Sequence, residues 1–334
     1  MKYVIYGAGA IGSLVGAHLA RAGTEVVLLG RPAHVAAIRA GGLRVKTKTG
    51  TEVTPVHAVA DLQQVGFAEG DVILLTVKTQ DTGPACAALA RRAPLDIPVF
   101  CLQNGVRGED IAAHSFHSVY GVVLSLGVRL AGPGEIVNYT GVNLLTIGRY
   151  PNGLDATAET VGRDLAAGGF EVSLSSDVMA VKWSKLIINL SNSLYAILGL
   201  SINELRNSAE GRAFMADVWD EGLEVLEAAG IHPAPIPGRP AQREEVRLLR
   251  EPTAPQPLPE DPDLQYYPST WQDLVLQRGS TESAYLNGEI IALGRRHHVP
   301  TPLNDLLQRL VEDMAARRER PGKYSIDELR AMRA

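Results

Sequence analysis

Three polar side chains recur at a spacing of four residues inside an otherwise apolar stretch. In DVMAVKWSKLIINLSNSLYAIL, the residues Lys185, Asn189 and Ser193 would share one face of a predicted helix over 177–199. A polar group buried among leucines and isoleucines needs a partner, so these side chains either satisfy one another or line a cleft. Exposure to solvent is the competing interpretation, which the surrounding apolar residues disfavour.

A glycine triplet of the form G-x-G-x-x-G directly follows the strand-like segment KYVIY and opens a predicted helix. In dinucleotide-binding proteins the first glycine permits a tight turn, the second lets the backbone approach the pyrophosphate, and the third lets helix and strand pack closely. The start of the helix attracts phosphate charge. An ordinary glycine turn is the alternative. We predict that the cofactor binds at Gly7, Ala8, Gly9, Ala10, Ile11 and Gly12.

The residues after the second predicted strand, EVVLLG, indicate which dinucleotide binds. An NAD site usually has Asp or Glu here, and this chain has Gly30 and Arg31. An arginine can donate forked, charge-assisted hydrogen bonds to a 2′-phosphate. We therefore predict NADP(H) as the cofactor, with a solvated surface arginine as the alternative interpretation of Arg31.

Two more polar residues follow predicted strands at their carboxyl ends, where open α/β sheets bind ligands. Lys78 comes directly after DVILLTV, and Asn104 ends VFCLQN before Gly105. Alone, Lys78 would be a surface charge at a strand end, but two such positions on neighbouring strands favour a site. Asn104 could direct its amide at the nicotinamide or at the substrate.

A further pair, Thr270 and Glu282, lies in PSTWQDLVLQRGSTESAYLNGEI, which we expect to form one helix or two successive helices. By composition alone, Thr281 and Glu282 could equally cap a helix on a solvated face. These residues do not by themselves decide between the two interpretations.

The elements that must position these side chains alternate in the first half of the chain. KYVIY, EVVLLG, DVILLTVK and IPVFCL are short strand-like runs separated by amphipathic stretches, which predicts a parallel sheet with crossover helices. A hairpin is expected around Thr49 and Gly50, and the strands within 118–148 are expected to extend the sheet. A helix over about 152–167 and the strand FEVSLS should complete this domain.

From Asp177 onward, strand patterns give way to helical periodicity over 177–199, 203–229, 268–297 and 302–317. The predicted fold class is therefore α/β: an N-terminal Rossmann-type doubly wound sheet followed by an all-helical domain. We expect an NADP-binding domain at 1–175 and a helical substrate and catalytic domain at 176–334. The latter contains a proline-rich excursion at about 232–268 with one short helix in QREEVRLLR.

Composition limits the classes of function. The 334 residues are 46% hydrophobic and 21% charged, which is typical of a globular protein. A net charge of −5, with lysines and arginines scattered, indicates no nucleic acid partner. We expect no membrane span, no signal peptide, a cytoplasmic location and no metal site, since His297 and His298 lack a matching ligand cluster. Cys86 and Cys101 are expected to be buried, reduced thiols.

Six sequence markers follow one another along the chain. They are GAGAIG, Arg31, TVK ending at Lys78, LQNG around Asn104, W-x-K-L-x-x-N from Trp183 to Asn189, and ST…QD…STE…LNG from Ser269 to Gly288. Together they resemble the ketopantoate reductase family, also called 2-dehydropantoate 2-reductases. The resemblance covers essentially the whole chain and is far more specific than the glycine triplet.

The resemblance implies an active site between a Rossmann domain and a helical domain, at which NADPH reduces the small 2-oxo acid 2-dehydropantoate to pantoate in pantothenate and coenzyme A biosynthesis. It further implies that Lys185 is the general acid. The residues implied to hold substrate are Asn104, Asn189, Ser193 and Thr270, and those implied to contact the cofactor include Lys78, Asn104 and Glu282.

Two departures from the family pattern concern the substrate side. The family usually has a second asparagine followed by proline where this chain has Ser193 and Leu194, and Ala284 replaces an acidic residue. A reductase of another 2-oxo acid or an opine-type dehydrogenase is therefore an alternative. A non-catalytic NADP sensor is a second alternative, which the presence of Lys185 and Glu282 disfavours. A homodimer through the helical domain is also expected.

Overall fold

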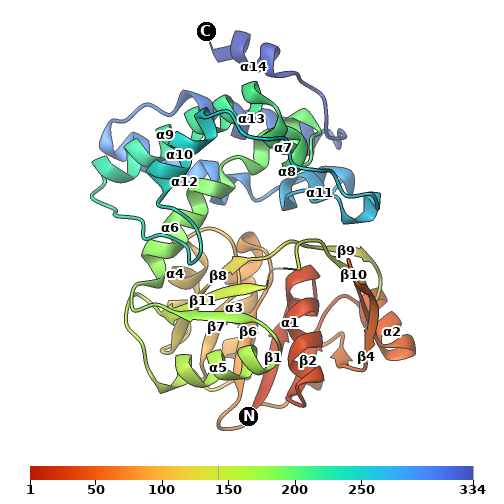
Figure 1. Cartoon of the computed structure of the whole chain (residues 1–334). Helices are drawn as coiled ribbons and strands as arrows, with labels where there is room; N and C mark the ends of the chain where they lie inside the picture. The colour runs from red at the N-terminus through yellow and green to blue at the C-terminus, as the bar shows by residue number, and fades with distance from the viewer. Residues whose placement is uncertain (142, 334) are drawn as a thin grey trace. The chain divides into compact units, whose positions relative to one another are not determined.

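The computed structural model describes residues 1–141 and 143–333, and the chain divides into two compact units between Met179 and Ala180. The first unit is built on an eight-stranded sheet (Figure 1). Its strands, in sheet order, are β12 (Glu171–Leu174), β11 (Leu144–Arg149), β8 (Val119–Ser125), β7 (Val99–Cys101), β6 (Val72–Leu75), β1 (Lys2–Tyr6), β2 (Glu25–Leu29) and β5 (His57–Val59).

Six neighbouring strands of this sheet, from β5 to β8, run parallel, while β11 runs antiparallel to β8 and β12 runs parallel to β11. Counted along the chain, the parallel strands lie in the order 3-2-1-4-5-6, the arrangement of a Rossmann sheet. The order reverses between β1 and β6. Ligands of such sheets bind outside the carboxyl ends of the strands at this point.

Helices cover both faces of the sheet, as the strand β1 illustrates. Tyr3 and Ile5 belong to one buried cluster and Val4 to another, because successive side chains of a strand point to opposite faces. The first cluster includes residues of α1 (Ala10–Arg21) and α5 (Ala156–Ala167), and the second includes residues of α3 (Thr82–Ala90) and α4 (Gly108–Ala113). The predicted doubly wound α/β fold is confirmed.

A separate four-stranded sheet corrects one expectation. The hairpin around Thr49 and Gly50 is present as β3 (Leu43–Thr47) and β4 (Gly50–Thr54). However, β9 (Val128–Gly132) and β10 (Glu135–Asn138) pair with this hairpin and do not extend the large sheet. Ile136 of β10 faces Val45 of β3, and both are buried in the cluster shared with α1. Alternation in the sequence predicts a half-buried strand and does not choose its partner.

The second unit is helical, as predicted. Its helices are α6 (Val178–Asn189, which begins in the first unit), α7 (Asn192–Leu198), α8 (Ile202–Asn207), α9 (Ala209–Ala228), α10 (Gln242–Arg250), α11 (Ser269–Val275), α12 (Asn287–His297), α13 (Pro302–Ala316) and α14 (Ile326–Arg333). The short helix expected in QREEVRLLR is α10. Helix α14 had no counterpart among the predicted elements.

Three predicted long helices are each interrupted. The stretch 177–199 breaks after Asn189, where Asn287 Nδ2 donates to the Leu190 carbonyl oxygen at 3.0 Å. Ser193 therefore lies on α7, and the prediction that it shares one helix with Lys185 is wrong. Asn287 is distant in the sequence, so helical periodicity alone could not reveal this contact at the break.

The other two interruptions have local causes. Ser208 has an extended backbone and caps α9 by accepting from the Gly211 amide at 3.1 Å, which separates α8 from α9 within 203–229. Within 268–297, Gln277 and Gly279 have φ angles of +49° and +79°, which end the helical path after α11. A 3₁₀ turn at Ser283–Tyr285 then leads into α12.

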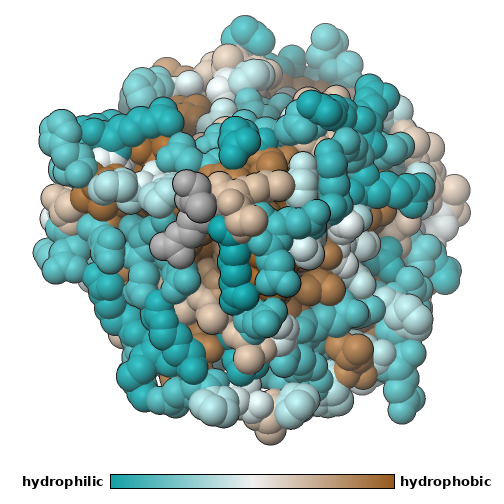
Figure 2. Space-filling model, turned by 90° about the horizontal axis from the view of Figure 1, so that it is seen from above, coloured by the Kyte–Doolittle hydropathy of each residue, from teal (hydrophilic) through white to brown (hydrophobic). Residues whose placement is uncertain are grey.

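The surface shown in Figure 2 is mainly hydrophilic, with hydrophobic residues in patches among the polar ones. Within residues 1–141 and 143–333, no helix is both long and apolar enough to cross a membrane.

A buried hydrogen bond beside the α6–α7 break offers a test of the packing in the helical unit. Trp219 Nε1 donates to Ser191 Oγ at 2.6 Å, and neither residue is exposed. We expect Ser191→Ala to leave the indole N–H unsatisfied and to lower the free energy of unfolding by about 1–3 kcal/mol. Denaturant unfolding followed by circular dichroism measures this. The exposed Ser280→Ala is the control, and equal stability of both variants would contradict the prediction.

Candidate active site

The glycine turn after β1 has two kinds of glycine. Gly7 has a φ of +115°, and a Cβ there would lie 2.7 Å from the Val77 amide nitrogen. A Cβ on Gly12 would lie 2.5 Å from the Gly7 carbonyl oxygen, so the backbone excludes a side chain at both positions. A Cβ on Gly9 would have its nearest contact at 3.9 Å. The space beside Gly9 is therefore not needed for protein packing, which fits the approach of a pyrophosphate.

Helix α1 begins at Ala10 with Gly9 as its N-cap, and its first turn has no side-chain cap and no acidic residue. The first N–H groups of a helix lack partners within the helix, and the helix dipole makes this end positive. The turn is thus suited to a phosphate, in agreement with the predicted contacts at Ala8, Ala10 and Ile11, which stay predictions.

Gly30, after β2, limits which side chain can lie next to the glycine turn. A Cβ at this position would lie 2.7 Å from the Ala8 Cβ, so the acidic residue typical of an NAD site has no space here. The next residue, Arg31, is exposed and is the N-cap of α2 (Pro32–Gly41). Its guanidinium is therefore accessible to a 2′-phosphate.

His34 holds the start of α2 against α1. It is buried, its Nδ1 accepts from the Gly134 amide at 2.9 Å, and its Nε2 lies 3.0 Å from Ser13 Oγ. Burial lowers the pKa of His34, so the neutral ring is favoured. Because Nδ1 is an acceptor, Nε2 carries the proton and donates to Ser13 of α1. Arg31, one turn earlier, is positioned by this contact.

Lys78 and Asn104 lie in adjacent loops at the carboxyl ends of β6 and β7, and both are half-buried. Thr79 Oγ1 donates to the Asn104 carbonyl oxygen at 3.4 Å. Thr76 Oγ1 donates to the Gly7 carbonyl oxygen at 2.6 Å, which joins the same loop to the glycine turn. The residues predicted from three separate strands are therefore brought together in the first unit.

In the second unit, Lys185 and Asn189 lie one turn apart on α6, as predicted. Asn189 is buried and Lys185 is half-buried. Burial, the largest cause, lowers the pKa of Lys185 to about 8 because it disfavours the charged amine. The positive charges of Arg239 and Arg206 contribute to this lowering, the Glu245 carboxylate opposes it, and the value of about 8 is the combined result. An amine whose pKa lies near the working pH is suited to proton transfer.

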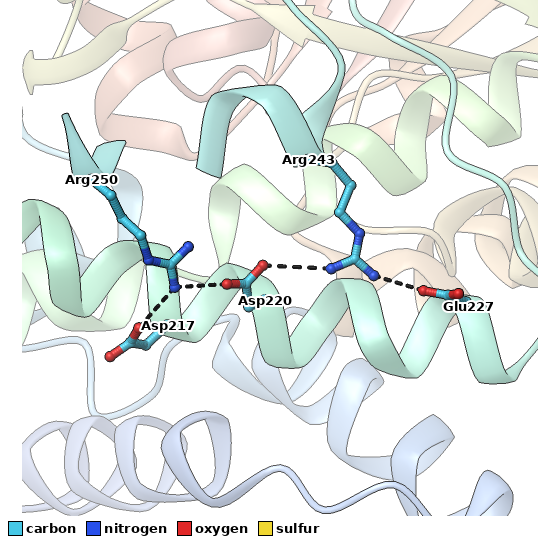
Figure 3. Close-up of polar contacts among 5 residues, drawn as sticks. All are labelled: Asp217, Asp220, Glu227, Arg243 and Arg250. Atoms are coloured by element: carbon cyan, nitrogen blue, oxygen red, sulfur yellow. Dashed lines mark hydrogen bonds and ion pairs between the residues drawn. The ribbon is translucent and has the colours of Figure 1, made fainter. Parts of the chain in front are cut away.

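The Glu245 carboxylate is itself held by Arg239, with contacts of 2.7 Å from Nε and 3.1 Å from Nη2. Glu245 belongs to α10, which ion pairs of 2.7–3.5 Å fasten to α9. These pairs join Arg243 and Arg250 on α10 to Asp217, Asp220 and Glu227 on α9 (Figure 3). On α6, Ser184 Oγ donates to Gln242 Oε1 at 2.7 Å, so α10 also contacts the residue next to Lys185.

Ser193 has a different environment from the one predicted. It is fully buried on α7, and its Oγ donates to Asn287 Oδ1 at 2.9 Å. Asn287 Nδ2 in turn donates to Asn304 Oδ1 at 3.0 Å, and Asn304 Nδ2 donates to Glu221 Oε2 at the same distance. This chain of hydrogen bonds joins α7, α12, α13 and α9. A substrate contact of Ser193 stays a prediction.

Thr270 and Glu282 lie outside a common helix. Thr270 is on α11, and Glu282 precedes the 3₁₀ turn before α12 and is buried. Within the described part of the chain, Thr270 Oγ1 and the neighbouring Trp271 Nε1 are buried without hydrogen-bond partners. Such groups are costly unless something completes them. This favours the prediction that Thr270 binds substrate.

The sequence did not predict the charged residues that act on Lys185. Arg206, Arg239 and Glu245 have no periodic relation to Lys185, and Arg239 stands in the proline-rich excursion. The only available signal was general: a lysine buried among apolar residues needs charged neighbours.

Cys86 and Cys101 are buried and stand outside any disulfide in the described residues, as predicted, and burial raises the pKa of Cys86 to about 11. In the part of the chain that the structure describes, no cluster of three or more His, Cys, Asp or Glu side chains could hold a metal ion.

Comparison with known proteins gives concordant matches for both units. Residues 3–152 match the family profile described as ketopantoate reductase PanE/ApbA, and residues 177–315 match that of its C-terminal domain. A 2-dehydropantoate 2-reductase of Pyrococcus horikoshii is 30% identical over 93% of this chain and 97% of its own length. That of Halobacterium salinarum is 29% identical over 93% of this chain and 98% of its own length.

Solved structures agree with these matches. A PanE/ApbA family ketopantoate reductase from Ralstonia eutropha superposes with a TM-score of 0.79 and 32% identity, covering 95% of this chain and 99% of its own. D-mandelate dehydrogenase in complex with NADH and anilino(oxo)acetate has a TM-score of 0.80 and 25% identity, covering the same shares. The resemblance stated from the sequence markers, the oxidoreductase class and the nicotinamide cofactor are confirmed.

The two kinds of glycine in the turn predict different results for one substitution. We expect Gly9→Ala to keep the melting temperature but to weaken dinucleotide binding, because its methyl group would enter space not used by the protein. Gly12→Ala should lower the melting temperature as well, because its methyl group would meet the Gly7 carbonyl oxygen. Thermal unfolding and cofactor titration measure the two effects. A large loss of stability in Gly9→Ala would contradict the assignment.

Proposed function

Because the chain belongs to the ketopantoate reductase family, we propose that it reduces 2-dehydropantoate to pantoate with NADPH, a step of pantothenate and coenzyme A biosynthesis. The observation that carries this proposal is Lys185, a half-buried amine with a pKa of about 8 one turn from the buried Asn189. We further propose that residues 1–175 bind the dinucleotide and that residues 176–334 supply the proton donor and substrate contacts. A cytoplasmic location and a homodimer remain predictions.

The residues of the first unit fit NADPH better than NADH. Gly30 leaves no space for a carboxylate, and the exposed Arg31 can donate to a 2′-phosphate. Lys78 and Asn104 would hold the rest of the cofactor at the point where the strand order reverses. Bound there, NADPH would supply the hydride for the carbonyl carbon.

The second unit would supply the proton. As the carbonyl carbon is reduced, the electron pair of the C=O bond moves to oxygen, and the Lys185 ammonium stabilises this charge and then protonates it. Asn189 and Thr270 would orient the substrate through hydrogen bonds, and Glu282 would contact the cofactor. Burial, together with Arg239 and Arg206, lowers the pKa of the donor and so favours release of its proton.

A second candidate is the reduction of a different 2-oxo acid. The Ser193 hydroxyl already forms a hydrogen bond with Asn287, so the substrate side differs from the pattern expected of the family. The similarity to D-mandelate dehydrogenase favours the same alternative. The test is oxidation of NADPH and of NADH by the purified protein with ketopantoate, pyruvate and 2-oxoisovalerate. Selective turnover of ketopantoate supports the main proposal, activity with another acid supports this one, and inactivity with all would favour a non-catalytic NADP sensor.

The proton donor makes a prediction about turnover and its pH dependence. We expect Lys185→Ala to lower kcat by about 10²–10⁴-fold with nearly unchanged affinity for NADPH. In the unchanged protein, kcat/KM should fall as the pH rises through about 8, because the ammonium of the substrate-free protein is lost. Lys185→Arg should be slow and should lack this alkaline fall, since an arginine stays protonated. Loss of NADPH binding in Lys185→Ala would contradict the assigned role.

The cofactor assignment predicts a selective effect at Arg31. We expect Arg31→Ala to weaken NADPH binding by about 10- to 100-fold, the range for a lost charge-assisted hydrogen bond, and to leave NADH binding unchanged. Fluorescence titration with each cofactor measures this. Arg44→Ala removes the same charge from an exposed position on β3 and is the control. Equal losses for NADPH and NADH would remove the 2′-phosphate assignment.

A further inference from the structure

Arg206, at the end of α8, carries a positive charge that no carboxylate pairs with in residues 1–141 and 143–333. The side chain is half-buried, and its Nε is buried without a hydrogen-bond partner within these residues. A guanidinium has five N–H donors in a planar fork that matches a carboxylate. Arg206 therefore has donors available in a partly desolvated position.

Tyrosine hydroxyls accompany this guanidinium. The Tyr195 hydroxyl donates to Met215 Sδ at 3.5 Å, which leaves its oxygen as the acceptor in the hydrogen bond that it shares with Arg206. Tyr266 is within electrostatic reach of both Tyr195 and Arg206. These groups, called the Arg206 cluster below (Arg206, Tyr195 and Tyr266), contain one full charge and no anion to balance it.

The proline-rich segment 251–268 is hydrogen-bonded to both ends of α8, and these bonds position the Arg206 cluster. Asn207 makes two hydrogen bonds to the backbone of Gln256, donating to its carbonyl oxygen at 2.9 Å and accepting from its amide at 2.8 Å. At the other end of α8, the Ile202 amide donates to the Tyr266 carbonyl oxygen at 3.1 Å. The segment is thus attached to both ends of the helix that carries Arg206, and it places Tyr266 beside that helix.

The cluster acts on the proposed proton donor. Arg206 and Arg239 both lower the pKa of Lys185, and only Glu245 opposes them. Glu245 is already bound by Arg239. Lys185, Arg206 and Arg239 carry positive charge, and Glu245 carries the one negative charge. The partly buried site therefore has a net positive charge, whose burial costs free energy unless an anion enters. In a 2-oxo acid, the carboxylate is bonded directly to the carbonyl carbon, so the substrate brings this anion close to its own reacting group.

We propose that Arg206 binds the carboxylate of the 2-oxo acid, with Tyr195 and Tyr266 holding the guanidinium in place. This inference rests on the proposed function and extends it. The carboxylate completes the unpaired donors of Arg206 and neutralises the excess charge around Lys185. It also makes the enzyme selective for ionised 2-oxo acids over neutral ketones of the same shape.

The experiment compares ketopantoate with its uncharged methyl ester in the wild type, Arg206→Gln and Arg206→Lys. We expect Arg206→Gln to raise KM for the acid by about 10- to 100-fold, to leave KM for the ester and the affinity for NADPH unchanged, and to be partly rescued in Arg206→Lys. Arg243→Gln removes an exposed arginine that pairs with α9 and is the control. If KM for the acid and the ester rose equally, or if neither rose, the proposal would be wrong.

The pH profile supplies a readout that a purely structural role would not change. Removing the charge of Arg206 should raise the pKa of Lys185 in the substrate-free protein, so the alkaline fall of kcat/KM in Arg206→Gln should move above pH 8. Burial, Arg239 and Glu245 continue to act on Lys185 in this variant. An unmoved alkaline limb counts against the inference. A wild type that reduces no 2-oxo acid would refute the proposed function, whereas an active wild type with an unaffected Arg206→Gln would refute only the inference.

Discussion

As the proposed proton donor, Lys185 must be charged enough to donate a proton and buried enough to release it, and much of the helical unit bears on this constraint. Burial and, to a smaller extent, two arginines lower its pKa to about 8, against the effect of one carboxylate that raises it. That carboxylate, Glu245, is placed by α10, which the ion pairs in Figure 3 attach to α9. Individual surface ion pairs contribute little to stability. Here they hold α10 in place, so that Glu245 stays close to α6.

The first unit meets a different constraint, the close approach of backbone segments. Gly7 and Gly12 leave no space for a Cβ, because the glycine turn touches the loop after β6. The same loop contacts the Asn104 segment through Thr79. These contacts put three strand ends together at the reversal of strand order, which is where a dinucleotide approaches such a sheet. Of the three motif glycines Gly7, Gly9 and Gly12, Gly9 alone has open space where a Cβ would stand.

On the proposed substrate side, Ser193 departs from the family pattern, and its hydroxyl has a packing role in the fold. Ser193 joins a buried chain of hydrogen bonds through Asn287 and Asn304, so its hydroxyl supports the packing of four helices. In the proposed mechanism, recognition of the substrate would then depend on other donors. Thr270 has a buried hydroxyl without a partner in the described chain, and Arg206 has a guanidinium without a carboxylate.

The sequence by itself determined the α/β class, the glycine turn, the strand-end positions of Lys78 and Asn104, and the pairing of Lys185 with Asn189 on one helix. These are local properties, because strand alternation, turn chemistry and the spacing of i and i+4 are all set by residues close in the chain.

Only the tertiary structure decided the partners of β9 and β10, the break that moves Ser193 onto α7, and the charges around Lys185. Each depends on residues distant in the sequence: Val45 facing Ile136, Asn287 bonding Leu190, and Glu245 approaching α6. Burial, hydrogen bonding and electrostatic interactions act between residues that are close in space. The periodicity of the sequence does not show which distant residues will come close.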